Sequence, residues 1–189
     1  MSLVTSDRER RLWLWTLAVV TAIFSTLALA PTVAAELRDR GILDAAFVWS
    51  ALLILAATVA LGLKIRPGGA EIGVALGVVA VYLMVFVRMA LPEERTHLME
   101  YGVVAVFIHE ALKERASQGR RVPVPALFAL VATALLGWID EGIQALLPSR
   151  VYDIQDVGFN ALAGLMAITA GLALARARRT RDHRRAQSR

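Results

Sequence analysis

Residues 125–147 of this 189-residue chain read PALFALVATALLGWIDEGIQALL. No charged side chain occurs before Asp140, and the run exceeds the roughly 20 apolar residues that a helix needs to cross a bilayer. A backbone in lipid must satisfy its own hydrogen bonds, and the alternation typical of barrel strands is absent from the sequence. The segment therefore predicts a membrane-spanning helix that ends in two acids, Asp140 and Glu141.

Five other apolar runs accompany this segment, at 12–30, 45–63, 72–90, 98–112 and 154–175. The run 98–112 is short and carries Glu100, His109 and Glu110, which makes it the least typical span. The whole chain is 57% hydrophobic with a mean hydropathy of +0.57, which is too apolar for an ordinary soluble domain. The sequence therefore predicts an all-α protein, a polytopic transmembrane helical bundle of about six spans.

Basic residues alternate between the loops. They precede the first run and follow the second, fourth and sixth runs, whereas acids balance them in the other loops. Under the positive-inside rule this pattern predicts a multi-pass protein of the cell membrane with both termini in the cytoplasm. The net charge of +5 thus reports topology and excludes nucleic acid as a partner.

Two terminal segments have alternative interpretations. The first run could be a signal peptide cleaved near Val33-Ala34-Ala35, which would leave five spans in the same orientation, but its length favours an anchor. The tail after Ala175 is basic and polar, and it is expected to be disordered beside anionic lipid.

Ionisable residues are costly inside a membrane, so their positions are informative. Three predicted spans each place polar side chains at helical spacing on one face. With the predicted topology, all of them lie within about two helical turns of the outer surface. Together with the nearby arginines, the set comprises Arg88, His97, Glu100, Tyr101, Asp140, Glu141, Gln144, Arg150, Asp153, Asp156 and Asn160.

Two segments resemble the signatures of VanZ-like membrane proteins. Residues 91–102, LPEERTHLMEYG, resemble the acidic–basic, His, Glu-Tyr signature, although Glu94 stands where a basic residue usually lies three before the His. The second segment has Asp140-Glu141 with Gln144, then Pro148-Ser149-Arg150, then the acids and Asn160 at the start of the last run. The resemblance implies a four-helix domain at 71–176, an added hairpin at 1–70 and a cytoplasmic tail at 177–189. It also implies a role linked to glycopeptide-antibiotic resistance, notably to teicoplanin.

The predicted outer site suits an envelope-related ligand that is lipid-linked, a glycopeptide or another anion. Neighbouring carboxylates can separate their pKa values into an acid and a base, and Arg150 could hold an anion in bidentate fashion. The candidate catalytic residues are His97, Glu100, Asp140, Glu141 and Asp156. The candidate ligand-binding residues are Arg88, Tyr101, Gln144, Arg150, Asp153 and Asn160.

Several alternatives stay open at this point. A divalent metal is possible at His97 and the acids. Alternatively, the cluster is structural, built of interfacial salt bridges and helix caps within a non-catalytic membrane scaffold. The absence of Cys excludes thiolate chemistry, and Lys113 stands where a His109-Glu110 zinc motif would need its second His. The sequence is compatible with an enzyme and with a non-catalytic binder, and with more than one oligomeric state.

Overall fold

The structure is a computed structural model that describes residues 4–27, 29–43, 45–46, 48–50, 52–53, 56, 67–88, 92–148 and 152–187. Within these residues the regular structure is entirely helical, which confirms the predicted all-α class. The helices are α1 (Asp7–Thr26), α2 (Ala30–Asp39), α4 (Gly69–Arg88), α5 (Pro92–Ser117), α6 (Pro125–Gln144) and α7 (Ile154–Gln187).

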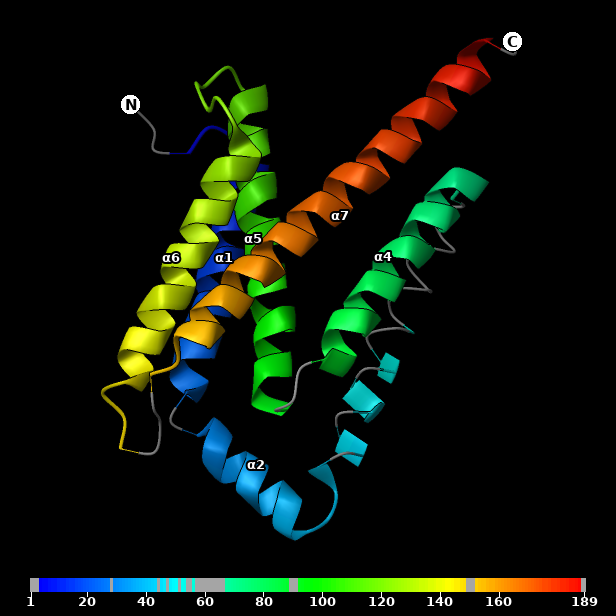
Figure 1. The fold of residues 1–189 in the computed structure, drawn as a ribbon. Coiled ribbons are helices and arrows are strands. Elements are labelled where there is room, and N and C mark those ends of the chain that lie inside the picture. Colours follow the sequence, from blue (N-terminus) through cyan, green and yellow to red (C-terminus); the bar gives the residue numbers. More distant parts are fainter. Residues whose placement is uncertain are drawn as a thin grey trace.

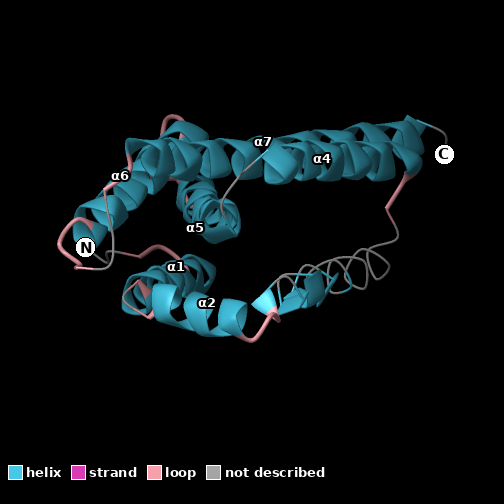
Figure 2. Cartoon of the chain, turned by 60° about the horizontal axis from the view of Figure 1, so that its bottom comes forward, coloured by secondary structure: helices cyan, strands magenta, loops and turns pink. Residues whose placement is uncertain are grey.

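Helix α5 occupies the centre of the bundle. It packs against α1 on one side and against α6 and α7 on the other, and α4 packs against α7 (Figure 1). The view of Figure 2 separates these layers, with α1 and α2 below α5 and with α6, α7 and α4 above it. The core around α5 consists of small and branched side chains, including Val104, Ala105 and Ile108.

Both termini lie toward the same end of the bundle (Figure 1). We call this the basic end, comprising residues 4–11, 67–71, 113–124 and 176–187. The other end, comprising residues 88, 92–101, 136–148 and 152–160, is called the site end. Helices α5 and α7 start at the site end, whereas α1, α4 and α6 run toward it.

Local sequence explains several helix boundaries. The Ser6 side chain caps α1 by accepting a hydrogen bond from the Glu9 backbone N–H at 3.0 Å. Helix α6 opens with Pro125, whose fixed φ suits a first helical turn and whose missing N–H costs nothing there. Between α5 and α6 the chain turns at Gly119, whose φ of +80° favours glycine.

The surface of this bundle is unusually apolar. Large hydrophobic side chains project outward along the helices, among them Trp15, Leu83 and Trp138, which is 57% exposed. Helices α6 and α7 are long and apolar enough to cross a membrane, yet only 28% and 33% of their apolar stretches are buried. Large apolar patches of this kind are rare on soluble monomers.

The remaining predicted spans have shorter apolar stretches or lie partly outside the described residues. Helix α4 has a shorter apolar stretch, Gly69–Val85. In α1 the charged residues 7–11 leave only 12–26 apolar, about 22 Å of helix against a hydrocarbon core of about 30 Å. Helix α5 carries charged residues near both of its ends, at 93–100 and 110–115, which leaves only a short uncharged stretch between them. Most of the predicted run 45–63 lies outside the described residues.

Two expectations outside the spans are wrong. The loop expected after residue 30 instead contains helix α2, and Arg40, directly after this helix, pairs with Glu36 one turn earlier. The tail after Ala175 is not disordered, because α7 continues without a break to Gln187. The tail residues are mostly alanine and arginine, which are good helix formers, and Glu71 of α4 binds two of the arginines.

Candidate functional site

Polar side chains from three helices meet at the site end of the bundle. His97 and Tyr101 come from α5, one helical turn apart, and their rings stack with centroids 6.1 Å apart. Helix α6 contributes Asp140 and Glu141 near its last turn, and all four residues are at most 5% exposed. Carboxylates are almost never this deeply buried unless they are paired or functional.

His97 and the two carboxylates form the centre of this cluster. The His97 Nδ1 lies 3.9 Å from an Asp140 carboxylate oxygen. One ligand atom from each of His97, Asp140 and Glu141 lies within 4.8 Å of the other two. Residues separated by more than 40 positions in the sequence are thus brought into direct proximity, as the shared predicted depth implied.

Glu141 links the end of α6 to the start of α7. One of its carboxylate oxygens accepts a hydrogen bond of 2.7 Å from the Gln144 side chain. The other accepts a hydrogen bond of 3.3 Å from the backbone N–H of Asp153. The carboxylate therefore satisfies a buried amide and positions the segment that leads into α7.

Asn160 lies against α6 one turn before the acids. It is fully buried, and its Nδ2 donates a long hydrogen bond of 3.5 Å to the Gly137 carbonyl. Among the described residues, no hydrogen-bond donor reaches its Oδ1. On the same stretch of α6, the Tyr101 hydroxyl donates to the Leu136 carbonyl at 3.4 Å. These bonds join α5 and α7 to α6 directly beside the central cluster.

The other predicted site residues are less deeply placed. Asp153 is exposed and caps α7, where its side chain accepts a hydrogen bond of 2.7 Å from the Gln155 backbone N–H. Glu100 and Asp156 are half-buried. Arg88, at the end of α4, is exposed and lines a pocket of about 300 Å³ with Met84, Val85 and Phe159. Arg150 lies outside the described residues.

The central trio has the composition of a divalent-metal site. Imidazole nitrogen and carboxylate oxygen are ligands for zinc, iron or manganese. Ligand atoms bound about 2.1 Å from a tetrahedral metal lie about 3.4 Å apart, so a small inward movement of these side chains would close the site. The donor set therefore fits a cation with open coordination positions.

Two buried acids at the basic end escaped the sequence analysis. Glu9 is fully buried and binds Thr5, Trp13 and Arg115. Burial raises the pKa of Glu9, but the hydrogen bonds from Thr5 and Trp13 and the charge of Arg115 outweigh it and hold the pKa below its usual value. The pattern Ser6-x-x-Glu9 resembles a capping box and is the signal that could have identified this residue.

Glu71 is the second such acid, 2% exposed in the first turn of α4. Its carboxylate accepts a hydrogen bond of 2.7 Å from the Gly68 backbone N–H and pairs with Arg178 at 3.0 Å and with Arg181. The Gly68 hydrogen bond, followed by the charge of Arg181, lowers the pKa of Glu71. The position of an acid directly before a predicted span is the signal that could have identified Glu71. Its partners could not be predicted, because they are remote in the sequence.

Comparison of the chain with protein-family models, with curated proteins and with solved structures finds no match. The resemblance to VanZ-like proteins therefore rests on the two quoted segments. The geometry of the site end is independent of that resemblance.

Proposed function

We propose that this chain is a VanZ-like multi-pass protein of the cell membrane, with about six spans and both termini in the cytoplasm. Its site end faces outward and binds or acts on an envelope-related ligand, which is lipid-linked, a glycopeptide or another anion. The observation that carries this proposal is that His97 of α5 lies buried close to Asp140 and Glu141 of α6, with one ligand atom of each within 4.8 Å of the other two.

The surface of the bundle supports the membrane part of the proposal. Apolar side chains face outward on α1, α4, α6 and α7, while polar ones are buried between helices. Both termini lie at the basic end (Figure 1), together with the arginines that follow α5. Placing this end in the cytoplasm satisfies the positive-inside rule and puts the His97 cluster near the outer surface.

The chemistry of the cluster supports acid–base catalysis on a bound ligand. A histidine beside one carboxylate can accept or donate a proton, and the second carboxylate biases which group holds it. Arg88 lies exposed at the same end and supplies a cation for an anionic ligand, with Arg150 as a further candidate.

A divalent cation would suit the same three residues. Bound between His97, Asp140 and Glu141, it would offset the two buried carboxylates and polarise an anionic ligand. The expected consequence is a rise in melting temperature when Zn²⁺ or Mn²⁺ is added to the purified protein, and its loss in His97→Ala.

The alternative function is a non-catalytic membrane scaffold with a structural polar cluster. The hydrogen bonds of Glu141 to Gln144 and to the Asp153 backbone favour it, because they hold α6 to α7. So does the capping role of the Asp153 side chain.

Paired histidine variants test these two functions. His97→Ala should abolish glycopeptide resistance or ligand binding in cells expressing the chain, with a melting temperature in detergent close to the unmodified protein. His109→Ala is the matched control, because His109 is 7% exposed on the same helix but lies far along α5 toward the basic end. Equal activity of both variants would refute the proposed site.

The variant Asp140→Asn distinguishes an enzyme from a binder. In an enzyme, this substitution should abolish turnover while the ligand still binds.

A further inference from the structure

An apolar groove lies between α4 and α7, which pack alongside each other (Figures 1 and 2). Its volume is about 420 Å³, and its lining comes from the stretch 74–82 of α4 and the stretch 166–173 of α7. This volume is typical of pockets that hold small ligands. None of the lining residues belongs to the site described above, so the groove needs its own explanation.

The groove is suited to a hydrocarbon chain. Only two of its lining side chains are polar, and the hydroxyl of one, Thr169, donates to backbone carbonyls of its own helix at 2.7 and 3.0 Å. The other, Tyr82, packs against a buried cluster beneath the groove, and a Cβ at Gly102 of α5 would lie 4.0 Å from its hydroxyl oxygen. At Gly77 the groove is open, because a Cβ there would meet nothing within 4 Å.

At the site end, a second hollow follows between the same two helices. It has a volume of about 300 Å³, and two of its lining residues, Val85 and Phe159, pack against the same buried cluster as Tyr82. Arg88 is the one charged residue of this lining. It is exposed and has no ion-pair partner within the described part of the chain. An unpaired guanidinium beside apolar walls favours an anionic group attached to a chain.

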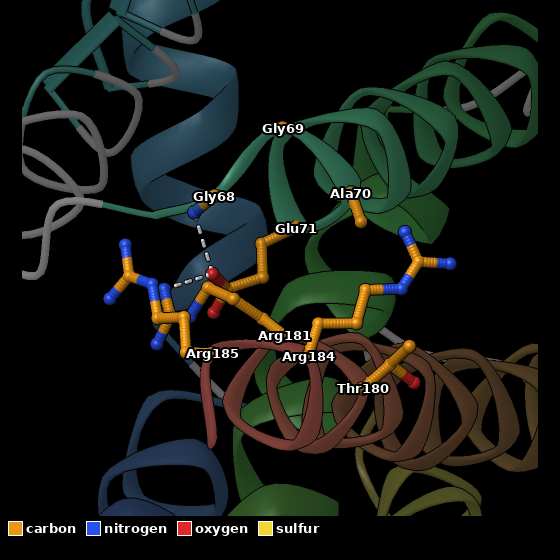
Figure 3. Close-up of a pocket in the computed structure, with 8 residues that line it drawn as sticks. All are labelled: Gly68, Gly69, Ala70, Glu71, Thr180, Arg181, Arg184 and Arg185. Atoms are coloured by element: carbon orange, nitrogen blue, oxygen red, sulfur yellow. Dashed lines mark hydrogen bonds and ion pairs between the residues drawn. The ribbon is translucent and has the colours of Figure 1, made fainter. Parts of the chain in front are cut away.

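The inner end of the groove is closed by ion pairs. Glu71, three residues before the first lining residue of α4, accepts a hydrogen bond from the Gly68 backbone N–H and pairs with Arg181 (Figure 3). It also pairs with Arg178. The last two arginines of α7 lie about 14–15 Å beyond residue 175, where the apolar span is predicted to end. The anionic group of an occupant is therefore expected at the outer end, beside Arg88.

The length of the groove matches one leaflet of a bilayer. Arg88 lies about 15 Å along α4 from Val78, which is half of a hydrocarbon core of about 30 Å. A chain whose head group binds at Arg88 would thus extend along the groove as far as the middle of the membrane.

We propose that the ligand of the site end is a lipid-linked phosphate in the outer leaflet, whose hydrocarbon chain lies in the groove between α4 and α7 and whose phosphate binds Arg88. The proposal rests on the proposed function, from which it takes the outward orientation of the site end, and it selects one of the ligand classes named there. The cluster beneath the groove contains Tyr101, whose ring stacks on that of His97. The occupied groove therefore adjoins the residues proposed to bind or act on the ligand.

The test measures the binding of hexadecyl phosphate to the full chain in a non-ionic detergent, with inorganic phosphate and hexadecanol for comparison. The unmodified protein should bind hexadecyl phosphate more tightly than either. Gly77→Leu fills the groove and should weaken this binding about 15-fold, the equivalent of about two buried CH2 groups. Gly73→Leu is the matched control, because Gly73 is also exposed and also in open space but lies outside the lining.

Arg88→Gln tests the contact with the head group. It should weaken the binding of hexadecyl phosphate about fivefold, the usual contribution of one basic residue near an anionic lipid, and should leave the binding of hexadecanol unchanged. Arg121→Gln removes the same charge at an exposed position of the basic end and should change neither affinity. Equal effects of these two variants would overturn the assignment of the phosphate to Arg88.

Three further outcomes would overturn the proposal. Equal affinities of Gly77→Leu and Gly73→Leu for hexadecyl phosphate would exclude the groove. Inorganic phosphate that binds as tightly as hexadecyl phosphate would assign the site to a soluble anion. A dimer that Gly77→Leu converts to a monomer would assign the groove to a second copy of the chain. If Gly77→Leu melts early without ligand, Ala173→Leu fills the same groove from α7, and an unchanged affinity in this variant would count against the proposal.

Failure of this proposal is distinguishable from failure of the proposed function. The function at the site end is tested with His97→Ala, whereas the groove is tested with the two glycine variants. Activity that depends on His97, together with equal affinities of both glycine variants, would overturn the groove alone. Binding that depends on Gly77, together with activity that does not depend on His97, would overturn the proposed function alone.

Discussion

At Gly137, helices α6 and α7 approach so closely that no side chain fits between them. A Cβ added there would lie 2.5 Å from the Asn160 Cβ and 2.8 Å from its Nδ2. We therefore expect Gly137→Ala to separate the helices beside Asp140 and to lower stability by about 1–3 kcal/mol, the usual cost of overpacking. Thermal melting in detergent measures this, and activity at the site end should fall with it.

Gly142→Ala provides the control for this residue-scale prediction. Gly142 lies on the same helix, but a Cβ there would meet nothing within 4 Å. Its melting temperature should remain unchanged or rise slightly, because alanine favours the helix. Equal stability of both variants would contradict the close packing around Asn160.

At the scale of elements, Ser6 joins the start of α1 to the end of α5. It caps α1 and also donates a hydrogen bond of 2.9 Å to Glu114, which pairs with Arg8 at 2.7 Å. Ser6→Ala should cost about 1 kcal/mol through loss of the cap alone. Ser25→Ala, near the other end of α1, removes only a bond to the Thr21 carbonyl within the helix and should have little effect. Chemical unfolding in detergent compares the two, and a larger loss from the Ser25 variant would contradict this assignment.

The contact of α4 with the end of α7 should depend on pH. Because the folded-state pKa of Glu71 lies below its ordinary value of 4.5, its ion pairs stabilise the contact above that pH. This stabilisation is lost as the pH falls through the lowered pKa. The chain has no native Cys, so spin labels at Ala70→Cys and Thr180→Cys can report the distance between the helices.

These labels should give a narrow distance distribution at pH 7 and a broad one at pH 3. Glu71→Gln should broaden the distribution already at pH 7. Glu36→Gln, which removes an exposed pair with Arg40, is the control and should match the unmodified protein. A distribution that stays narrow in Glu71→Gln would mean that Glu71 does not hold the two helices together.

At the scale of the whole molecule, the alternating basic loops predict a topology that reporter fusions can measure. Fusions after Ala35, Pro92 and Ser149 should report the outside of the membrane, and a fusion at the C-terminus should report the cytoplasm. Both termini lie toward one end of the bundle (Figure 1), where an even number of spans would place them. A cytoplasmic signal from the fusion after Pro92 would require a different number of spans.

Much of the site end could be predicted because it depends on local regularities. Helical spacing predicted that His97 and Tyr101 lie on one face of α5. Hydropathy predicted that the start of α5 and the end of α6 lie at the same depth. The structure then brings His97 within 3.9 Å of Asp140. A Cβ added at Gly164 would lie 3.1 Å from the Thr133 Cγ2, so α7 lies close to α6 there, whereas a Cβ added at Gly171 would meet nothing within 4 Å. Periodicity alone does not tell which glycine faces a neighbouring helix.

By itself, the sequence determined that the chain is helical, where its apolar segments lie and at which ends of these segments the His97 cluster is found, because these properties follow from hydropathy and helical period within one segment. Tertiary structure alone decided that Glu9 and Glu71 are buried and that the tail is an ordered continuation of α7. Glu71 and its partners Arg178 and Arg181 are separated by 107 and 110 residues. Which charges meet across such a separation depends on how the helices cross, and crossing is set by the packing of whole helix faces rather than by any one segment.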